Sequence, residues 1–134
     1  MSIFQSPKFL RNVLFADAAS CLATGALQVL FTQPLAQLLN LPALLLQSTG
    51  IFLLAYAAVA MLVATREPIP RSLVWVFVVG NFAWAVGCIV MLVDHMVSPA
   101  VLGEAWILAQ AAAVVVLAEL QWTGLRRSRP IGWA

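Results

Sequence analysis

The sequence predicts an all-α membrane protein whose four transmembrane helices form an up-down-up-down bundle. The first observation is composition: 63% of the 134 residues are hydrophobic and 9% are charged, against about 25% charged in typical soluble domains. The second is four apolar runs, each close to the roughly 20 residues that span a bilayer. The third is that all seven prolines fall outside these runs, as expected for uninterrupted helices. Together they exclude a soluble enzyme, a disordered chain and a disulfide scaffold.

The whole chain is expected to form one membrane domain, residues 1–134, with spans at about 13–31, 43–64, 73–93 and 100–122. Basic Lys8 precedes the first run, as in a signal peptide. That run is too long for the apolar core of such a peptide, contains Asp17 and lacks a small-residue cleavage site, so we interpret it as a retained span. The connections are short, which makes consecutive spans antiparallel neighbours.

The segment between the first two spans is uncharged and mixes four leucines with glutamine and asparagine. This amphipathic pattern predicts a short helix at about 34–41 that lies at the outer membrane interface. A loop with a few leucines dipped into lipid fits the same pattern equally well.

The positive charges predict the orientation of the bundle. All seven lysine and arginine residues lie before the first span, between the second and third, or after the fourth. By the positive-inside rule both termini are cytoplasmic, as expected for a multi-pass protein of the bacterial cytoplasmic (inner) membrane. The net charge of +2 and the absence of a basic stripe argue against a nucleic-acid partner.

Polar groups inside the spans are the candidate ligand- or proton-binding residues. With a rise of about 1.5 Å per residue, they fall into three layers of depth, each drawn from more than one span. We expect these side chains to face one another, because lipid cannot satisfy an amide or a carboxyl group. With one tryptophan beside them, the candidates are Asp17, Cys21, Tyr56, Asn81, Trp84, Gln110 and Glu119.

Structural roles for the same residues remain open. Asn81 and Gln110 could be hydrogen-bonding glue between helices, and Trp84 could be a packing wedge. Cys21 differs in depth from the second cysteine by about 10 Å, too far for a disulfide. Glu119 could extend its carboxylate to the cytoplasmic surface.

Asp17 is the strongest functional candidate. A carboxylate two turns inside a span costs a few kcal/mol on insertion scales, so it must be neutral, paired or hydrated. Glu119 is expected at the same depth, and two adjacent carboxyl groups would favour protonation of one of them. Pairing with Arg11 would hold Asp17 ionised instead.

The residue inventory argues against an enzyme. His95 is the only histidine, and the two cysteines form no CxxC motif. No metal site and no cofactor are therefore expected. No nucleophile–base pair is evident either.

Three runs, RNVLFADAASCLATG, WVFVVGNFAWAVG and LAQAAAVVVLAELQWTGLRR, resemble small four-span integral membrane proteins of bacteria. The layout is more distantly similar to the DoxX-like superfamily of four-helix membrane proteins. Some members bind sterols or other hydrophobic molecules through membrane carboxylates, and Asp17 is the residue to which the resemblance would transfer that role.

The expected function is non-enzymatic. The protein would bind a hydrophobic or lipid-like ligand, or act as an accessory subunit for a membrane protein partner. The alternative is a small proton-coupled transporter that works through Asp17 as a homo-oligomer, because four helices enclose little aqueous volume.

Overall fold

All regular structure in the computed structural model, which describes residues 7–66 and 69–127, is helical. The four long helices are each long and apolar enough to cross a membrane. These findings confirm the all-α class and support a multi-pass membrane protein. The helices are α1 (Pro7–Leu30), α2 (Thr32–Leu39), α3 (Ala43–Ala64), α4 (Arg71–Val93) and α5 (Val101–Arg127).

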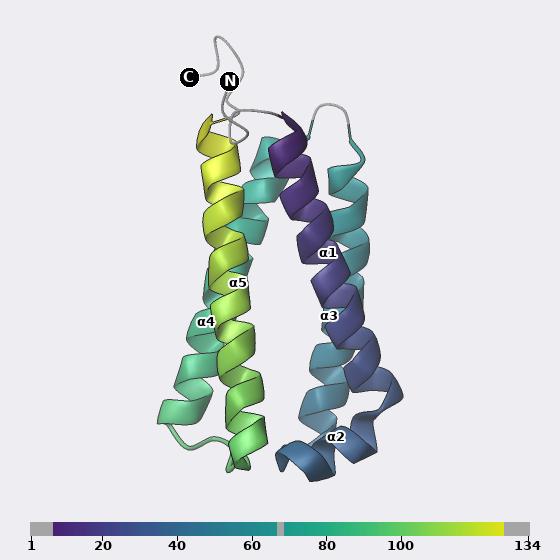
Figure 1. Cartoon of the computed structure of the whole chain (residues 1–134), viewed down its shortest axis with the longest axis vertical. Helices are drawn as coiled ribbons and strands as arrows, with labels where there is room; N and C mark the ends of the chain where they lie inside the picture. Colours follow the sequence, from purple (N-terminus) through teal and green to yellow (C-terminus); the bar gives the residue numbers. More distant parts are fainter. Residues whose placement is uncertain (1–6, 67–68, 128–134) are drawn as a thin grey trace.

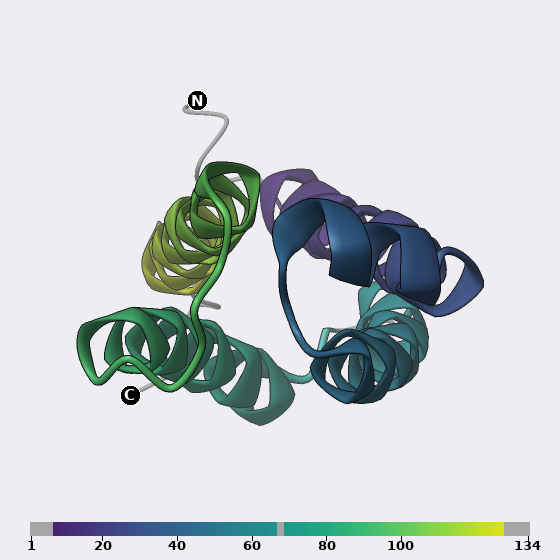
Figure 2. The same ribbon diagram turned by 90° about the horizontal axis from the view of Figure 1, so that it is seen from below.

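The four long helices are arranged as two pairs (Figure 1). Helix α1 packs along α3, α4 packs along α5, and the two pairs meet chiefly through α1 and α5. A view along the bundle shows the four helices around a common centre, with α3 facing α4 on the least closely packed side (Figure 2). The cavity described below opens on this side, between α3 and α4.

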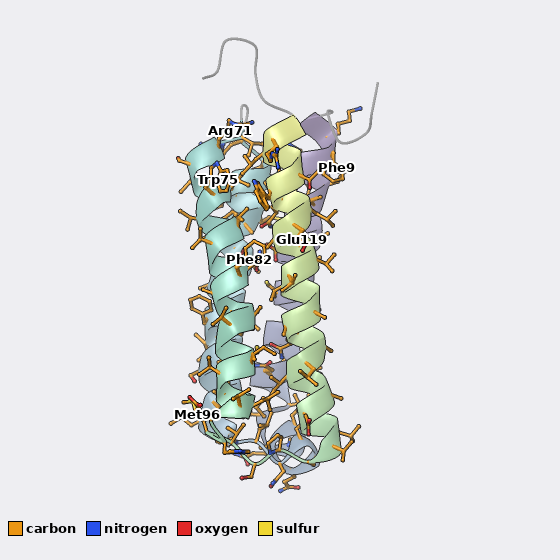
Figure 3. All side chains as sticks on the ribbon, turned by 90° about the vertical axis from the view of Figure 1, so that its left-hand side faces the viewer. Phe9, Arg71, Trp75, Phe82, Met96 and Glu119 are labelled. Atoms are coloured by element: carbon orange, nitrogen blue, oxygen red, sulfur yellow. The ribbon has the colours of Figure 1, made fainter. Side chains whose placement is uncertain are left out.

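Helix α1 begins and α5 ends at the same end of the molecule (Figure 1). At this end the apolar core draws on all four long helices and includes Leu14, Ala60, Phe77 and Leu125. Arg71 labels this end in Figure 3, and Met96 labels the opposite end.

Two arginines tie the helices of each pair together at this end. Arg11, in α1, donates from Nε to the carbonyl of Ala64 (2.8 Å) and from Nη2 to that of Arg66 (3.0 Å), where α3 ends. Arg71, in α4, donates to the carbonyl of Leu125 near the end of α5. Both arginines thus bind carbonyl groups that helix geometry leaves unpaired and that attract positive charge.

Helix α2 closes the opposite end. The helix is followed by Asn40, whose φ of 53° is the left-handed conformation typical of the residue that terminates a helix. The Asn40 amide donates to the carbonyl of Ser98 (2.6 Å), and Ala100 donates to that of Leu39 (3.0 Å). A Cβ atom on Gly103 would lie 2.1 Å from the Leu39 oxygen, so only glycine fits there.

The helix boundaries differ from the predicted spans mainly at the basic end. The structure begins α1 at Pro7 rather than residue 13, and extends α5 to Arg127 rather than residue 122. Hydropathy marks the part of a helix that lies in hydrocarbon, whereas the backbone hydrogen bonds continue into the charged turns at the interface. Helix α2 lies two residues earlier than the helix predicted at 34–41.

Candidate functional site

Asp17 lies at the centre of a hydrogen-bonded cluster that joins all four long helices. Its Oδ2 accepts hydrogen bonds from Tyr56 Oη (2.9 Å), Asn81 Nδ2 (3.3 Å) and Gln121 Nε2 (2.6 Å), and its Oδ1 accepts from Cys21 Sγ (3.5 Å). The Asn81 amide also donates to Gln121 Oε1 (3.1 Å). The Asp17 side chain is fully buried.

A second polar layer crosses the bundle nearer to α2. Trp84 Nε1, in α4, donates to Gln110 Oε1 of α5 (3.3 Å), and Gln110 Nε2 donates to Gln28 Oε1 of α1 (3.4 Å). Gln28 Nε2 in turn donates to the Leu46 carbonyl (2.8 Å) and to Thr49 Oγ1 (2.9 Å) of α3. Asp17 and Gln28 are eleven residues apart in α1, so the two layers are separated by about 16 Å.

A cavity of about 480 Å³ borders this second layer. It is almost wholly apolar, apart from the glutamine, threonine and tryptophan groups at its inner wall. Its size is within the range of pockets that hold small molecules. The lining residues come from α1, α3, α4, α5 and the turn after α2, and include Gln28, Leu41, Leu46, Phe52, Trp84, Cys88, Trp106 and Gln110.

The cavity opens sideways between α3 and α4. Phe52 of α3 and Gly80 and Gly87 of α4 line it and are also exposed on the outside of the bundle. The Phe52 ring stacks on that of Trp84, with centroids 5.7 Å apart and an interplanar angle of 14°. A Cβ atom at either glycine would meet no other atom within 4 Å. In a membrane this opening faces the lipid.

The structure divides the seven candidates into three groups. Four of them, Asp17, Cys21, Tyr56 and Asn81, meet in the buried cluster. Two others, Trp84 and Gln110, line the cavity. The last, Glu119, belongs to neither group.

Of the alternatives for Asp17, the pairing with Glu119 does not occur in the structure. Glu119 is exposed on the outer surface of α5 (Figure 3), whereas Gln121 on another face of the same helix contacts Asp17. Equal depth did not bring the two carboxyl groups together, because positions 119 and 121 lie about 200° apart around a helix.

The guanidinium group of Arg11 donates to the carbonyls of Ala64 and Arg66 at the end of α3. Among the described residues no cation is paired with Asp17; uncharged hydrogen-bond donors surround the carboxyl group instead. Asp17 is also absent from the cavity wall. The geometry therefore places the ligand-sized space and the buried acid in separate parts of the bundle.

Two glutamines are more central than the sequence analysis indicated. Gln121 makes the shortest contact to Asp17, at 2.6 Å, and Gln28 links three helices. Each lies on a polar stripe that the sequence already displays, Gln28 eleven residues after Asp17 and Gln121 eleven after Gln110. No sequence pattern singles out Phe52, because its stacking partner Trp84 lies on another helix.

The remaining chemistry of the bundle is sparse. Cys21 and Cys88 are both buried, and neither forms a disulfide. Within residues 7–66 and 69–127, no three histidine, cysteine, aspartate or glutamate side chains lie close enough together to hold a metal ion.

Comparison of the chain with protein-family models, with curated proteins and with solved structures finds no match in any of the three.

Proposed function

We propose that this protein binds an apolar, lipid-like molecule that enters from the membrane between α3 and α4. The observation that carries this proposal is the cavity, because about 480 Å³ of nearly apolar space adjoins an opening on the outer surface of the bundle. Bundles of this length normally fill such space with side chains. Here Gly80 and Gly87 line the space without contributing a side chain.

The proposal is for a non-enzymatic protein of the bacterial inner membrane. The described residues provide a binding wall of glutamine, threonine and tryptophan without an evident nucleophile and base. The same binding function suits either a free-standing ligand-binding protein or an accessory subunit that presents its ligand to a membrane partner. A distant kinship with DoxX-like proteins is compatible with both.

The proposed topology is up-down-up-down with both termini in the cytoplasm. Lys8, Arg11, Arg66, Arg71 and Arg126 belong to the helix ends and connections at which α1 begins and α5 ends, whereas Arg129 lies outside the described residues. The cavity then lies in the outer half of the membrane, and α2 lies at the outer interface.

Photoaffinity labelling tests the binding proposal. The purified protein in phosphatidylcholine nanodiscs is irradiated with a C16 alkane that carries a diazirine, and the labelled residues are mapped by mass spectrometry. We expect labels on cavity residues such as Phe52, Trp84 and Trp106. Gly87 lines the cavity, and a Cβ atom there would meet no other atom within 4 Å, so the leucine of Gly87→Leu should occupy the opening and reduce labelling at least fivefold.

Val86→Leu is the matched control. It enlarges the neighbouring residue, which is exposed and does not line the cavity, and it should label like wild type. Equal labelling of Gly87→Leu and Val86→Leu would reject the proposed function.

A proton-coupled transporter is the second candidate, favoured by the fully buried Asp17 and its ring of donors. Proteoliposomes loaded with the pH-sensitive dye pyranine test it. A transporter that works through Asp17 should collapse an imposed pH gradient faster than the Asp17→Asn variant does. Equal rates for the two proteins reject this candidate.

A further inference from the structure

We infer that the ligand is an uncharged molecule whose polar group is a hydrogen-bond acceptor, such as a ketone, quinone or ester oxygen on an apolar chain. This inference rests on the proposed binding function and deepens it. Three properties of the cavity wall carry it: the absence of charge, the unused donor capacity of Gln110, and the unpaired indole nitrogen of Trp106.

The absence of charge excludes ionic ligands. None of the described residues that line the cavity is aspartate, glutamate, lysine, arginine or histidine. A carboxylate, phosphate or ammonium group would have to lose its hydration without gaining an opposite charge, which is strongly unfavourable in an apolar space. The ligand's polar group is therefore neutral.

The side-chain amides of Gln28 and Gln110 differ in how many of their N–H groups already donate a hydrogen bond. Gln28 is saturated as a donor, because Nε2 directs its two hydrogens to Leu46 and Thr49. The Thr49 hydroxyl donates to the carbonyl of Leu45 (2.6 Å). Gln110 Nε2 has one partner, Gln28 Oε1, at the long distance of 3.4 Å. One of its two amide hydrogens thus remains available.

Trp106 provides a second donor without a partner in the described part of the chain. Its Nε1 is buried and has no hydrogen-bond partner among the described residues, and its side chain lines the same cavity, four residues before Gln110 in α5. Side chains four residues apart share one face of a helix. An indole nitrogen can donate a hydrogen bond but cannot accept one. A ligand group that pairs with it must therefore be a hydrogen-bond acceptor.

These features also give the ligand an orientation. Both donors belong to α5, whereas the opening lies between α3 and α4. The acceptor group would face Gln110 and Trp106, and the apolar remainder would extend past Phe52 and Gly80 towards the lipid.

Competition against the alkyl diazirine tests this inference, with concentrations expressed as mole fractions in the bilayer. The competitors share a similar length and differ in one group: 2-tridecanone, tridecane and dodecanoate. We expect 2-tridecanone to compete about tenfold more strongly than tridecane, the effect of one buried hydrogen bond. Dodecanoate should compete no better than tridecane.

Trp106→Phe keeps an aromatic ring and removes the donor, and Gln110→Met removes the second donor at similar volume. Each should bring the preference for the ketone to threefold or less while tridecane still competes. Equal competition by ketone and alkane in wild type, or an unchanged preference in both variants, overturns the inference. Either result leaves the proposed function intact as long as Gly87→Leu blocks labelling. Labelling that Gly87→Leu does not affect overturns the proposed function itself.

Discussion

Asp17 joins the four long helices because a carboxyl group can accept several hydrogen bonds at once. Tyr56, Asn81 and Gln121 each come from a different helix and converge on one of its oxygens. In hydrocarbon no water is present to accept a hydrogen bond from an unpaired donor. Each of these side chains therefore relies on the Asp17 carboxyl group as its acceptor. One residue thereby fixes the relative rotation of all four helices.

Removing the acid should be far more costly than replacing it by an amide. Asp17→Leu removes the acceptor of the buried Asn81 and Gln121 amides and of the half-buried Tyr56 hydroxyl, and we expect a loss of about 2–4 kcal/mol in the free energy of unfolding. Asp17→Asn can present its carbonyl oxygen to the same donors and its amide to the Cys21 sulfur, so it should lose less than about 1 kcal/mol. Unfolding in mixed detergent and dodecyl sulfate micelles measures both.

Tyr56→Phe is the control for that comparison, since it removes one donor and leaves Asp17 with the others. It should cost about 1 kcal/mol. Equal stability of Asp17→Leu and Tyr56→Phe would show that the cluster does not hold the helices together.

At the scale of helices, glycines have opposite roles in the two pairs. A Cβ atom on Gly25 would lie 2.8 Å from the backbone oxygen of Gly50, so α1 and α3 touch backbone to backbone. This close approach lets Gln28 reach the Leu46 carbonyl. On α4, Gly80 faces empty space.

The same substitution should therefore have opposite effects at these two positions. Gly25→Ala must push α1 away from α3, and we expect it to lower stability by about 1–3 kcal/mol. Gly80→Ala meets no atom and should be neutral or stabilising by up to about 1 kcal/mol, because alanine favours the helix. Thermal denaturation in detergent compares the two, and a stability loss in Gly80→Ala as large as that in Gly25→Ala would contradict the assignment of open space.

An alanine ridge on α5 provides a test of self-association. Ala105, Ala109 and Ala113 follow each other at four-residue spacing and are exposed on the outside of the bundle, a surface that permits close approach of another helix. Ala109→Leu should leave the monomer folded, because the added atoms project outwards. If copies of the chain associate through this ridge, native mass spectrometry should show fewer oligomers of the variant, whereas an unfolded monomer would mean that the ridge is internal packing.

The helices could be predicted from sequence, but their mutual contacts could not. Hydropathy and proline positions locate α3 at the residues where the structure has it, because span length is a local property of the chain. Depth along the helices also identified most members of the Asp17 cluster. It did not determine which way each helix is rotated about its axis, so Glu119 was a candidate although its side chain lies on the outer face of α5. The cavity depends on the separation of α3 from α4, which no single helix specifies.

The whole molecule is joined at both ends and opens at the side, between α3 and α4. Near the basic end, the arginine contacts, the apolar core and the Asp17 cluster connect all four helices. Nearer to α2, the pairs separate along α3 and α4 and enclose the cavity. At the α2 end a second apolar core, which includes Leu39, Leu46 and Ile107, holds the helices on either side of the cavity.

The orientation of this asymmetry in the membrane is open to a direct test. The described lysine and arginine side chains belong to the end where α1 begins and α5 ends, and none lies in α2 or in the connection between α4 and α5. Basic residues near span ends are retained in the cytoplasm, so the end closed by α2, with the cavity beside it, should face outwards. Alkaline phosphatase, which is active only after export, should be active when fused after Asn40 or Val97 and inactive after Arg71 or Ala134. Activity at Ala134 would reverse the orientation and place the cavity in the inner leaflet.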